Sequence, residues 1–192
     1  MPRRPLMRLL SLACLVFMLA GIGAAFSPPA SARSAEYDRL DIQLTVLDDG
    51  TFRIAETQTV DFTDGPFTQG HRSIPLARIS GVENISVSEL VGGDAIAFEE
   101  NDSGEYDTFE VVRSSTEVDI RWVFPPADDE VRVFLIEYEL VGALRVYPDA
   151  QPPNQQVWYI PIGGTRTSET PVNFSTFTLD FTNPVDPAAI VL

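Results

Sequence analysis

Basic and sulfur-containing side chains are scarce in this 192-residue sequence, which has no lysine, one histidine (His71) and one cysteine (Cys14). Its 28 acidic residues outnumber 13 arginines, and the formal net charge is −15. Phosphate backbones and anionic lipid head groups are bound through Lys and Arg, so the charge excludes nucleic-acid binding. Because Cys14 lies in an apolar N-terminal run, the rest of the chain has no means of forming a disulfide or a Cys/His metal site.

The first 32 residues have the three parts of a secretion signal. A positively charged start precedes an apolar run from Leu9 to Phe26, and small residues follow at Ala30–Ala32. We expect cleavage before Arg33. The apolar run is near the lower limit for a helix that crosses about 30 Å of hydrocarbon, so an uncleaved signal anchor is the alternative. Either way, residues 33–192 are expected outside the cytoplasm.

Residues 33–192 are predicted to form a single all-β domain. Apolar and polar residues alternate from Leu40 to Val46 and, after a turn at Asp48–Gly50, continue on one parity from Phe52 to Phe62. No long stretch holds a helical period. About nine short strands, each with one apolar face, predict an antiparallel β-sandwich of immunoglobulin-like type with an undetermined strand order. The further strands are expected at Val82–Leu90, Ala95–Glu99, Tyr106–Val112, Val118–Phe124, Val131–Val141, Val157–Ile160 and Phe174–Phe181.

Two residues are predicted to serve the fold. Trp122 shares its parity with Ile120 and Phe124, which favours a position in the core between the sheets. Arg72 is expected to anchor the loop it lies in, because a guanidinium can donate several fixed hydrogen bonds to carbonyls or a carboxylate. The neighbouring His71 lacks the Gly-x-Ser-x-Gly context of a nucleophilic serine, so catalysis is not predicted there.

Several segments, in order, resemble a known family. They are the hairpin Tyr37–Phe62, then Gly65–Pro75, Ile120–Trp122, Tyr138–Asp149 and finally Trp158. Over residues 36–182 the sequence is similar to the N-terminal domain of a bacterial family of predicted membrane proteins, domain of unknown function 2207. The resemblance implies an extracytoplasmic β domain followed by transmembrane helices, and it assigns no catalytic residue. Because no such helix follows before Leu192, we expect either a secreted stand-alone form or part of an anchored protein.

An acidic segment supplies one candidate metal site. Its oxygen-bearing side chains fall at positions 1, 3, 5, 9 and 12 of a calcium loop, with Gly104 at position 6. The flanks alternate like strands, so a solvated hairpin turn is the favoured interpretation and a calcium-dependent adhesion domain the alternative. The proposed ligands are Glu99, Asn101, Ser103, Asp107 and Glu110.

Aromatic residues near a proline-rich segment supply a second candidate. Trp158 and Tyr159, with Tyr147, could form a platform on which sugar rings or a partner stack, although core packing is the favoured alternative. This would make the chain a carbohydrate-binding module.

The leading hypothesis is a non-enzymatic, extracytoplasmic interaction module that needs no cofactor. Its expected partner is an envelope protein or a glycan. Contact with the membrane is expected only through an uncleaved signal or a C-terminal anchor missing from this sequence.

Overall fold

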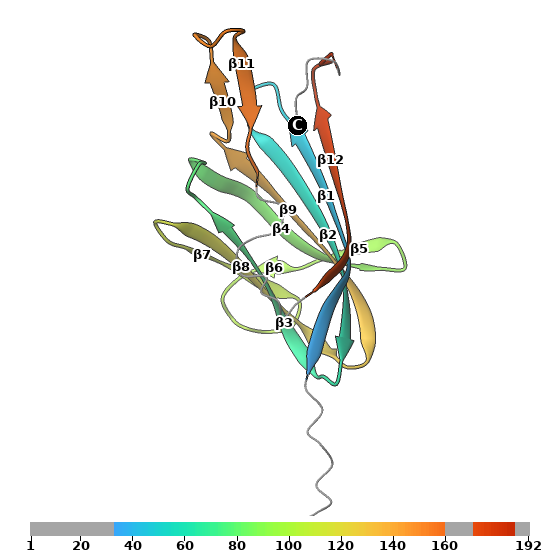
Figure 1. The fold of residues 1–192 in the computed structure, drawn as a ribbon. Helices are drawn as coiled ribbons and strands as arrows, with labels where there is room; N and C mark the ends of the chain where they lie inside the picture. Colours follow the sequence, from blue (N-terminus) through green and yellow to red (C-terminus); the bar gives the residue numbers. More distant parts are fainter. Residues whose placement is uncertain (1–32, 160–170, 187–192) are drawn as a thin grey trace, which may run out of the picture. The chain divides into compact units, whose positions relative to one another are not determined.

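The computed structural model describes residues 33–159 and 171–186 (Figure 1). The expected signal peptide therefore lies outside the described residues. The described part of the chain contains no helix that could span a lipid bilayer. Its secondary structure is all β, as the sequence predicts. The strands are β1 (Ser34–Val46), β2 (Phe52–Thr63), β3 (Phe67–Pro75), β4 (Gly81–Val91), β5 (Asp94–Ala97), β6 (Glu99–Glu100), β7 (Thr108–Arg113), β8 (Glu117–Ala127), β9 (Glu130–Val141), β10 (Leu144–Tyr147), β11 (Asn154–Val157) and β12 (Val172–Phe181).

The strands form two main sheets and a separate hairpin. The six-stranded sheet has the order β12-β1-β2-β9-β4-β5, the four-stranded sheet the order β3-β8-β7-β6, and β10 pairs with β11. The prediction of purely antiparallel pairing is wrong at two edges, because β12 runs parallel to β1 and β6 runs parallel to β7. Apolar alternation fixes which face of a strand is buried, but it does not fix the partner or the direction of pairing.

The core lies where the two sheets face each other. As predicted, Leu40 and Leu44 of β1 and Phe52 and Ile54 of β2 are fully buried. The four-stranded sheet contributes Trp122, whose ring lies 5.7 Å from that of Phe134 in β9, centroid to centroid. This pair joins the two sheets across the core. Other large buried side chains are Phe124, Ile120, Ile136 and Tyr138.

Strand β3 corrects the predicted loop that contains Arg72. It pairs antiparallel with β8, and Gly70 lies opposite Trp122. A Cβ atom at Gly70 would lie 2.3 Å from the indole ring, so glycine leaves the space that the ring occupies. This strand was not predicted from the sequence because Gly70 and polar side chains interrupt the apolar alternation. The short strands β6 and β10 were also not expected, and the described residues form twelve strands instead of nine.

Candidate functional site

Strand β3 sends neighbouring side chains to opposite sides of the four-stranded sheet. Arg72 is buried towards the six-stranded sheet, whereas His71 is exposed on the outer face. This alternation is a property of any β-strand. It creates two charged clusters. The inner cluster lies between the sheets and consists of Glu56, Gln58, Arg72, Tyr138 and Tyr159. The outer groove lies on the exposed face of the four-stranded sheet, around His71.

The inner cluster centres on an ion pair between β3 and β2. Arg72 donates from Nη2 to Glu56 Oε1 at 2.7 Å and from Nε to the same carboxylate at 2.9 Å. The side chains of Arg72 and Glu56 are 3% and 0% exposed. Arg72 also donates from Nη1 to the carbonyl oxygen of Ser73 at 2.7 Å. Both charges are therefore enclosed and hydrogen-bonded.

Two phenols complete the inner cluster. The hydroxyls of Tyr138 and Tyr159 donate to Glu56 Oε1 at 2.5 and 2.7 Å, and they lie 3.0 Å from each other. Gln58 Nε2 is 3.4 Å from Glu56 Oε2, while Gln58 Oε1 is buried with no hydrogen-bond partner in the described part of the chain. Through its hydrogen bond to Glu56, Tyr159 connects the segment after β11 to the core.

The pKa of Glu56 and the pKa values of the two tyrosines in the inner cluster shift in opposite directions. Burial by itself would raise the pKa of Glu56, but the charge of Arg72 and the hydrogen bonds from Arg72, Tyr138 and Tyr159 outweigh it, so this pKa lies below its ordinary value. Burial, together with the Glu56 charge, raises the pKa of both tyrosines. The cluster therefore holds an ionised pair and two neutral phenols at pH 7.

The inner cluster offers no space for a sizeable ligand. The cavity beside it, lined by Arg72, Trp158 and Tyr159 among others, has a volume of about 20 Å³. Such a volume has room for roughly one water molecule. We therefore assign the cluster to the fold: it fastens β2, β3, β9 and the segment that carries Tyr159.

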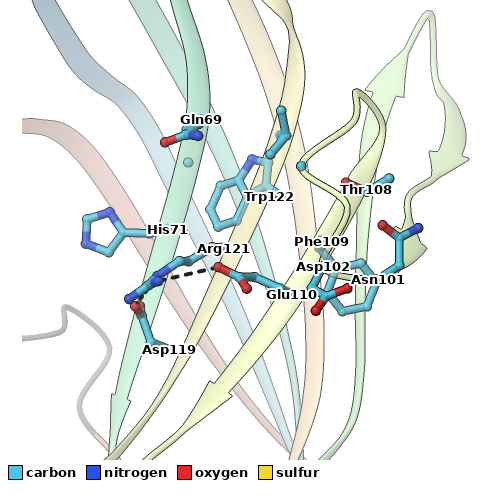
Figure 2. Close-up of a pocket in the computed structure, with 13 residues that line it drawn as sticks. Gln69, His71, Asn101, Asp102, Thr108, Phe109, Glu110, Asp119, Arg121 and Trp122 are labelled. Atoms are coloured by element: carbon cyan, nitrogen blue, oxygen red, sulfur yellow. Dashed lines mark hydrogen bonds and ion pairs between the residues drawn. The ribbon is translucent and has the colours of Figure 1, made fainter.

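The outer groove lies on the exposed face of the four-stranded sheet and has a volume of about 660 Å³ (Figure 2). Its floor consists of rows of side chains across β3, β8 and β7. In one row His71 faces Arg121, which faces Glu110 on β7. The preceding row comprises Gln69, Val123 and Thr108.

The loop between β6 and β7 forms a wall of the groove. Asn101, Asp102 and Gly104 line it from this side. The loop is fixed by backbone hydrogen bonds, in which Asn101 donates to Phe109 and Asp107 donates to Val123 at 2.9 and 2.8 Å. The wall is therefore held by the same strands that form the floor.

Arg121 is the central charge of the groove. It donates from Nε to Asp119 Oδ2 at 2.7 Å, and its Nη1 lies 3.4 Å from Glu110 Oε1 (Figure 2). The hydrogen bond to Asp119 and the charge of that residue hold the pKa of Arg121 above its ordinary value. Its side chain is 52% exposed. The aromatic residues of the lining, Phe109 and Trp122, are by contrast buried.

The five predicted metal ligands do not form one set. Glu99 pairs along β6 with Thr108, Asn101 Oδ1 accepts hydrogen bonds from Ser103, and Glu110 faces Arg121. In residues 33–159 and 171–186, no group of three or more His, Cys, Asp or Glu side chains is placed to hold a metal ion. The flanks are strands, whereas the calcium loop of this spacing requires helices. Asp107 lies in the left-handed region, with φ of 62°.

The three predicted platform aromatics are also separated. Tyr147 pairs with Asn154, whereas Trp158 follows Val157 at the other end of the same ladder. Three strand residues span about 10 Å. Tyr159 turns to the inner cluster, and Trp158 lies under the guanidinium of Arg78 at 5.1 Å. The structure thus does not present these rings as a common face.

The sequence analysis singled out Arg72 of the inner cluster but not its buried neighbours Glu56 and Gln58, and it did not single out Arg121 of the outer groove. Glu56 and Gln58 lie on the buried parity of β2, between Ile54 and Val60. Two polar residues inside an apolar alternation were the available signal for a buried polar cluster. No comparable signal existed for Arg121, because its role depends on which strands flank β8.

The chain matches one protein family over most of its length. The family model described as the N-terminal domain of a predicted membrane protein, DUF2207, matches residues 36–186 and confirms the resemblance seen in the sequence. No curated protein is significantly similar to the chain.

Similar solved structures include a putative protease from Parabacteroides distasonis (12% identity, 60% of this chain and 24% of that one, TM-score 0.37). Others are the pilus 2b backbone protein of group B streptococcus (9% identity, 65% and 55%, TM-score 0.40) and an M1 zinc metallopeptidase from Deinococcus radiodurans (14% identity, 57% and 21%, TM-score 0.29). The chain thus spans between a fifth and about half of their lengths.

Proposed function

Since the chain belongs to the family of predicted membrane proteins called DUF2207, as its N-terminal domain, we propose that it is the extracytoplasmic binding module of an envelope protein. It acts by holding a partner, without catalysis. The extracytoplasmic side is supported by the secretion signal expected in residues 1–32. The immunoglobulin-like type of sandwich is part of the same proposal and is supported by the two sheets that share one core.

The outer groove is the observation that carries the proposal. A concave surface of about 660 Å³ is in the range of ligand-binding pockets, and its lining combines an imidazole, a guanidinium, carboxylates and amides. Most of these groups lie on β3, β7 and β8, which pack on the core through their other face, and Asn101 and Asp102 lie on the loop between β6 and β7. A rigid sheet that presents polar groups in fixed rows is suited to recognition.

A binding role is favoured over a catalytic one by the residues around His71. Within the described ranges, no serine or carboxylate is hydrogen-bonded to its imidazole. The sequence also lacks the Gly-x-Ser-x-Gly motif that is typical of an exposed nucleophilic serine.

Photocrosslinking in intact cells tests the proposal. A photoreactive amino acid replaces His71 in the groove or, as a control, Glu137, which is exposed on β9 of the six-stranded sheet. We expect position 71 to give a discrete crosslinked product that is absent from position 137. Equal products from both positions, or none from position 71, would contradict a binding role for the groove. Substrate turnover that disappears in His71→Ala would overturn the non-catalytic assignment.

A further inference from the structure

We infer that the outer groove takes a peptide segment through a lysine or arginine side chain. The inference rests on the proposed binding role and adds the chemical class of the ligand. It is carried by the charge balance of the lining, by its unused acceptors and by the position of its aromatic rings.

The charge balance favours a cation. Three carboxylates, those of Asp102, Glu110 and Asp119, line the groove beside the single guanidinium of Arg121. Asp119 and Glu110 already flank that guanidinium, which leaves an excess of negative charge on the loop side. An anionic ligand would have to approach these carboxylates without compensation.

Acceptor atoms remain unused in the groove. Arg121 contacts one oxygen of Glu110, and the side chain of Glu110 is 39% exposed. The Asp102 carboxylate is exposed and has no ion-pair partner in the described ranges. A lysine ammonium brings three donors and a guanidinium five, and neither has an acceptor to conflict with these oxygens.

The burial of the aromatic residues disfavours a sugar ligand. Stacking on a sugar requires an exposed ring face, but the lining aromatics Phe109 and Trp122 are 4% and 2% exposed. The volume of about 660 Å³ exceeds that of one long side chain. It therefore has room for the flanking backbone, whose amides can pair with Gln69 and Asn101.

The net charge of the whole sequence also favours a cationic ligand. A formal net charge of −15 creates a field that attracts cationic segments and raises their rate of association. Because these 192 residues contain no lysine, a lysine-bearing ligand lies outside them. Its binding should weaken with salt, since exposed charges are screened over about 10 Å at 0.1 M ionic strength.

The test uses His71 as a reporter, because it is the only histidine of the chain and lines the groove. Imidazole proton signals of the exported chain are followed by NMR as capped Ala-Lys-Ala, Ala-Gln-Ala or Ala-Glu-Ala tripeptide is added. We expect saturable shifts with the lysine peptide, at least about fivefold weaker binding of the glutamine peptide and none of the glutamate peptide.

Charge-neutralising variants locate the interaction. The double variant Asp102→Asn/Glu110→Gln is expected to bind the lysine peptide about tenfold more weakly, the combined effect of two partly exposed ion pairs. Asp61→Asn, on β2 in the other sheet, is the matched control and should bind like the wild type. Circular dichroism confirms that each variant is folded.

The outcomes separate this inference from the proposed function. Equal affinity for the lysine and glutamine peptides, or an unchanged affinity in the double variant, would overturn the cationic ligand while leaving a binding groove. Absence of any shift with all three peptides would also overturn it, and the crosslinking result at position 71 would then decide the binding role on its own.

Discussion

Arg72 and Arg121 lie on opposite faces of the same four-stranded sheet and make ion pairs of the same length. Arg72 contacts Glu56 at 2.7 Å with both side chains almost fully buried, and Arg121 contacts Asp119 at 2.7 Å with the arginine half exposed. Distance alone therefore does not distinguish the two pairs. Their surroundings do, because an enclosed charge that loses its partner has no water to replace it.

The two faces of strand β3 therefore have different roles. In β3 the side chain of Arg72 fastens the sheets, while the adjacent His71 belongs to the groove. Substitutions on the inner face should therefore change stability, and those on the outer face should change binding. The following variants test this division, beginning with the largest expected effect.

Arg72→Met should destabilise the fold by about 3–5 kcal/mol, because it leaves the Glu56 carboxylate buried without its counter-charge. Arg121→Met is the matched control and should change the stability far less, because an exposed ion pair contributes little. Urea denaturation followed by far-UV circular dichroism measures both. Similar losses in the two variants would mean that burial does not separate the clusters.

Gly70→Ala should cost about 1–3 kcal/mol, because the added methyl group meets the ring of Trp122 at 2.3 Å. Gly81→Ala provides the control, since nothing lies within 4 Å of a Cβ atom there. Its effect should stay within about 0.5 kcal/mol. The thermal midpoints of the two variants give the comparison, and an unshifted midpoint for Gly70→Ala would show that Trp122 is not held against β3.

Tyr159→Phe removes one hydrogen bond to Glu56 and should destabilise by about 0.5–1.5 kcal/mol. Tyr147→Phe removes a hydroxyl whose contact with Gln156 is long and exposed, so its effect should be near zero. Urea titrations resolve a difference of this size. If Tyr147→Phe proved the more destabilising, the assignment of Tyr159 to the inner cluster would be wrong.

Much of the fold could be predicted from the sequence, and the site could not. The alternation through Leu40–Val46 and Phe52–Phe62 gave the first hairpin, because burial of one face imposes a period of two. Strand β3 was not predicted, because Gly70 stands where a core side chain would be expected and leaves space for Trp122. That reason lies on another strand, 52 residues away in the sequence.

The candidate site escaped prediction for the same physical reason. Arg121, Glu110 and His71 become one row only through the order β3-β8-β7, which apolar patterns do not encode. The calcium spacing and the aromatic platform were patterns along the chain. In the structure Glu110 pairs with Arg121 and Tyr159 donates to Glu56. Contacts between strands, and not spacing along the chain, therefore determine the partners of these side chains.

The most direct test compares the pH dependence of stability in the wild type, Glu56→Gln and Glu110→Gln between pH 7 and pH 3. The pKa of Glu56 is held below its ordinary value near 4.5, so its contribution is complete above that pH and is lost as the pH falls below it. We predict that Glu56→Gln is less stable at pH 7 and loses less further stability on acidification than the wild type, whereas Glu110→Gln, which removes an exposed ion pair, is nearly as stable as the wild type at pH 7. An unchanged acid dependence in Glu56→Gln would contradict the division between a structural inner face and a binding outer face.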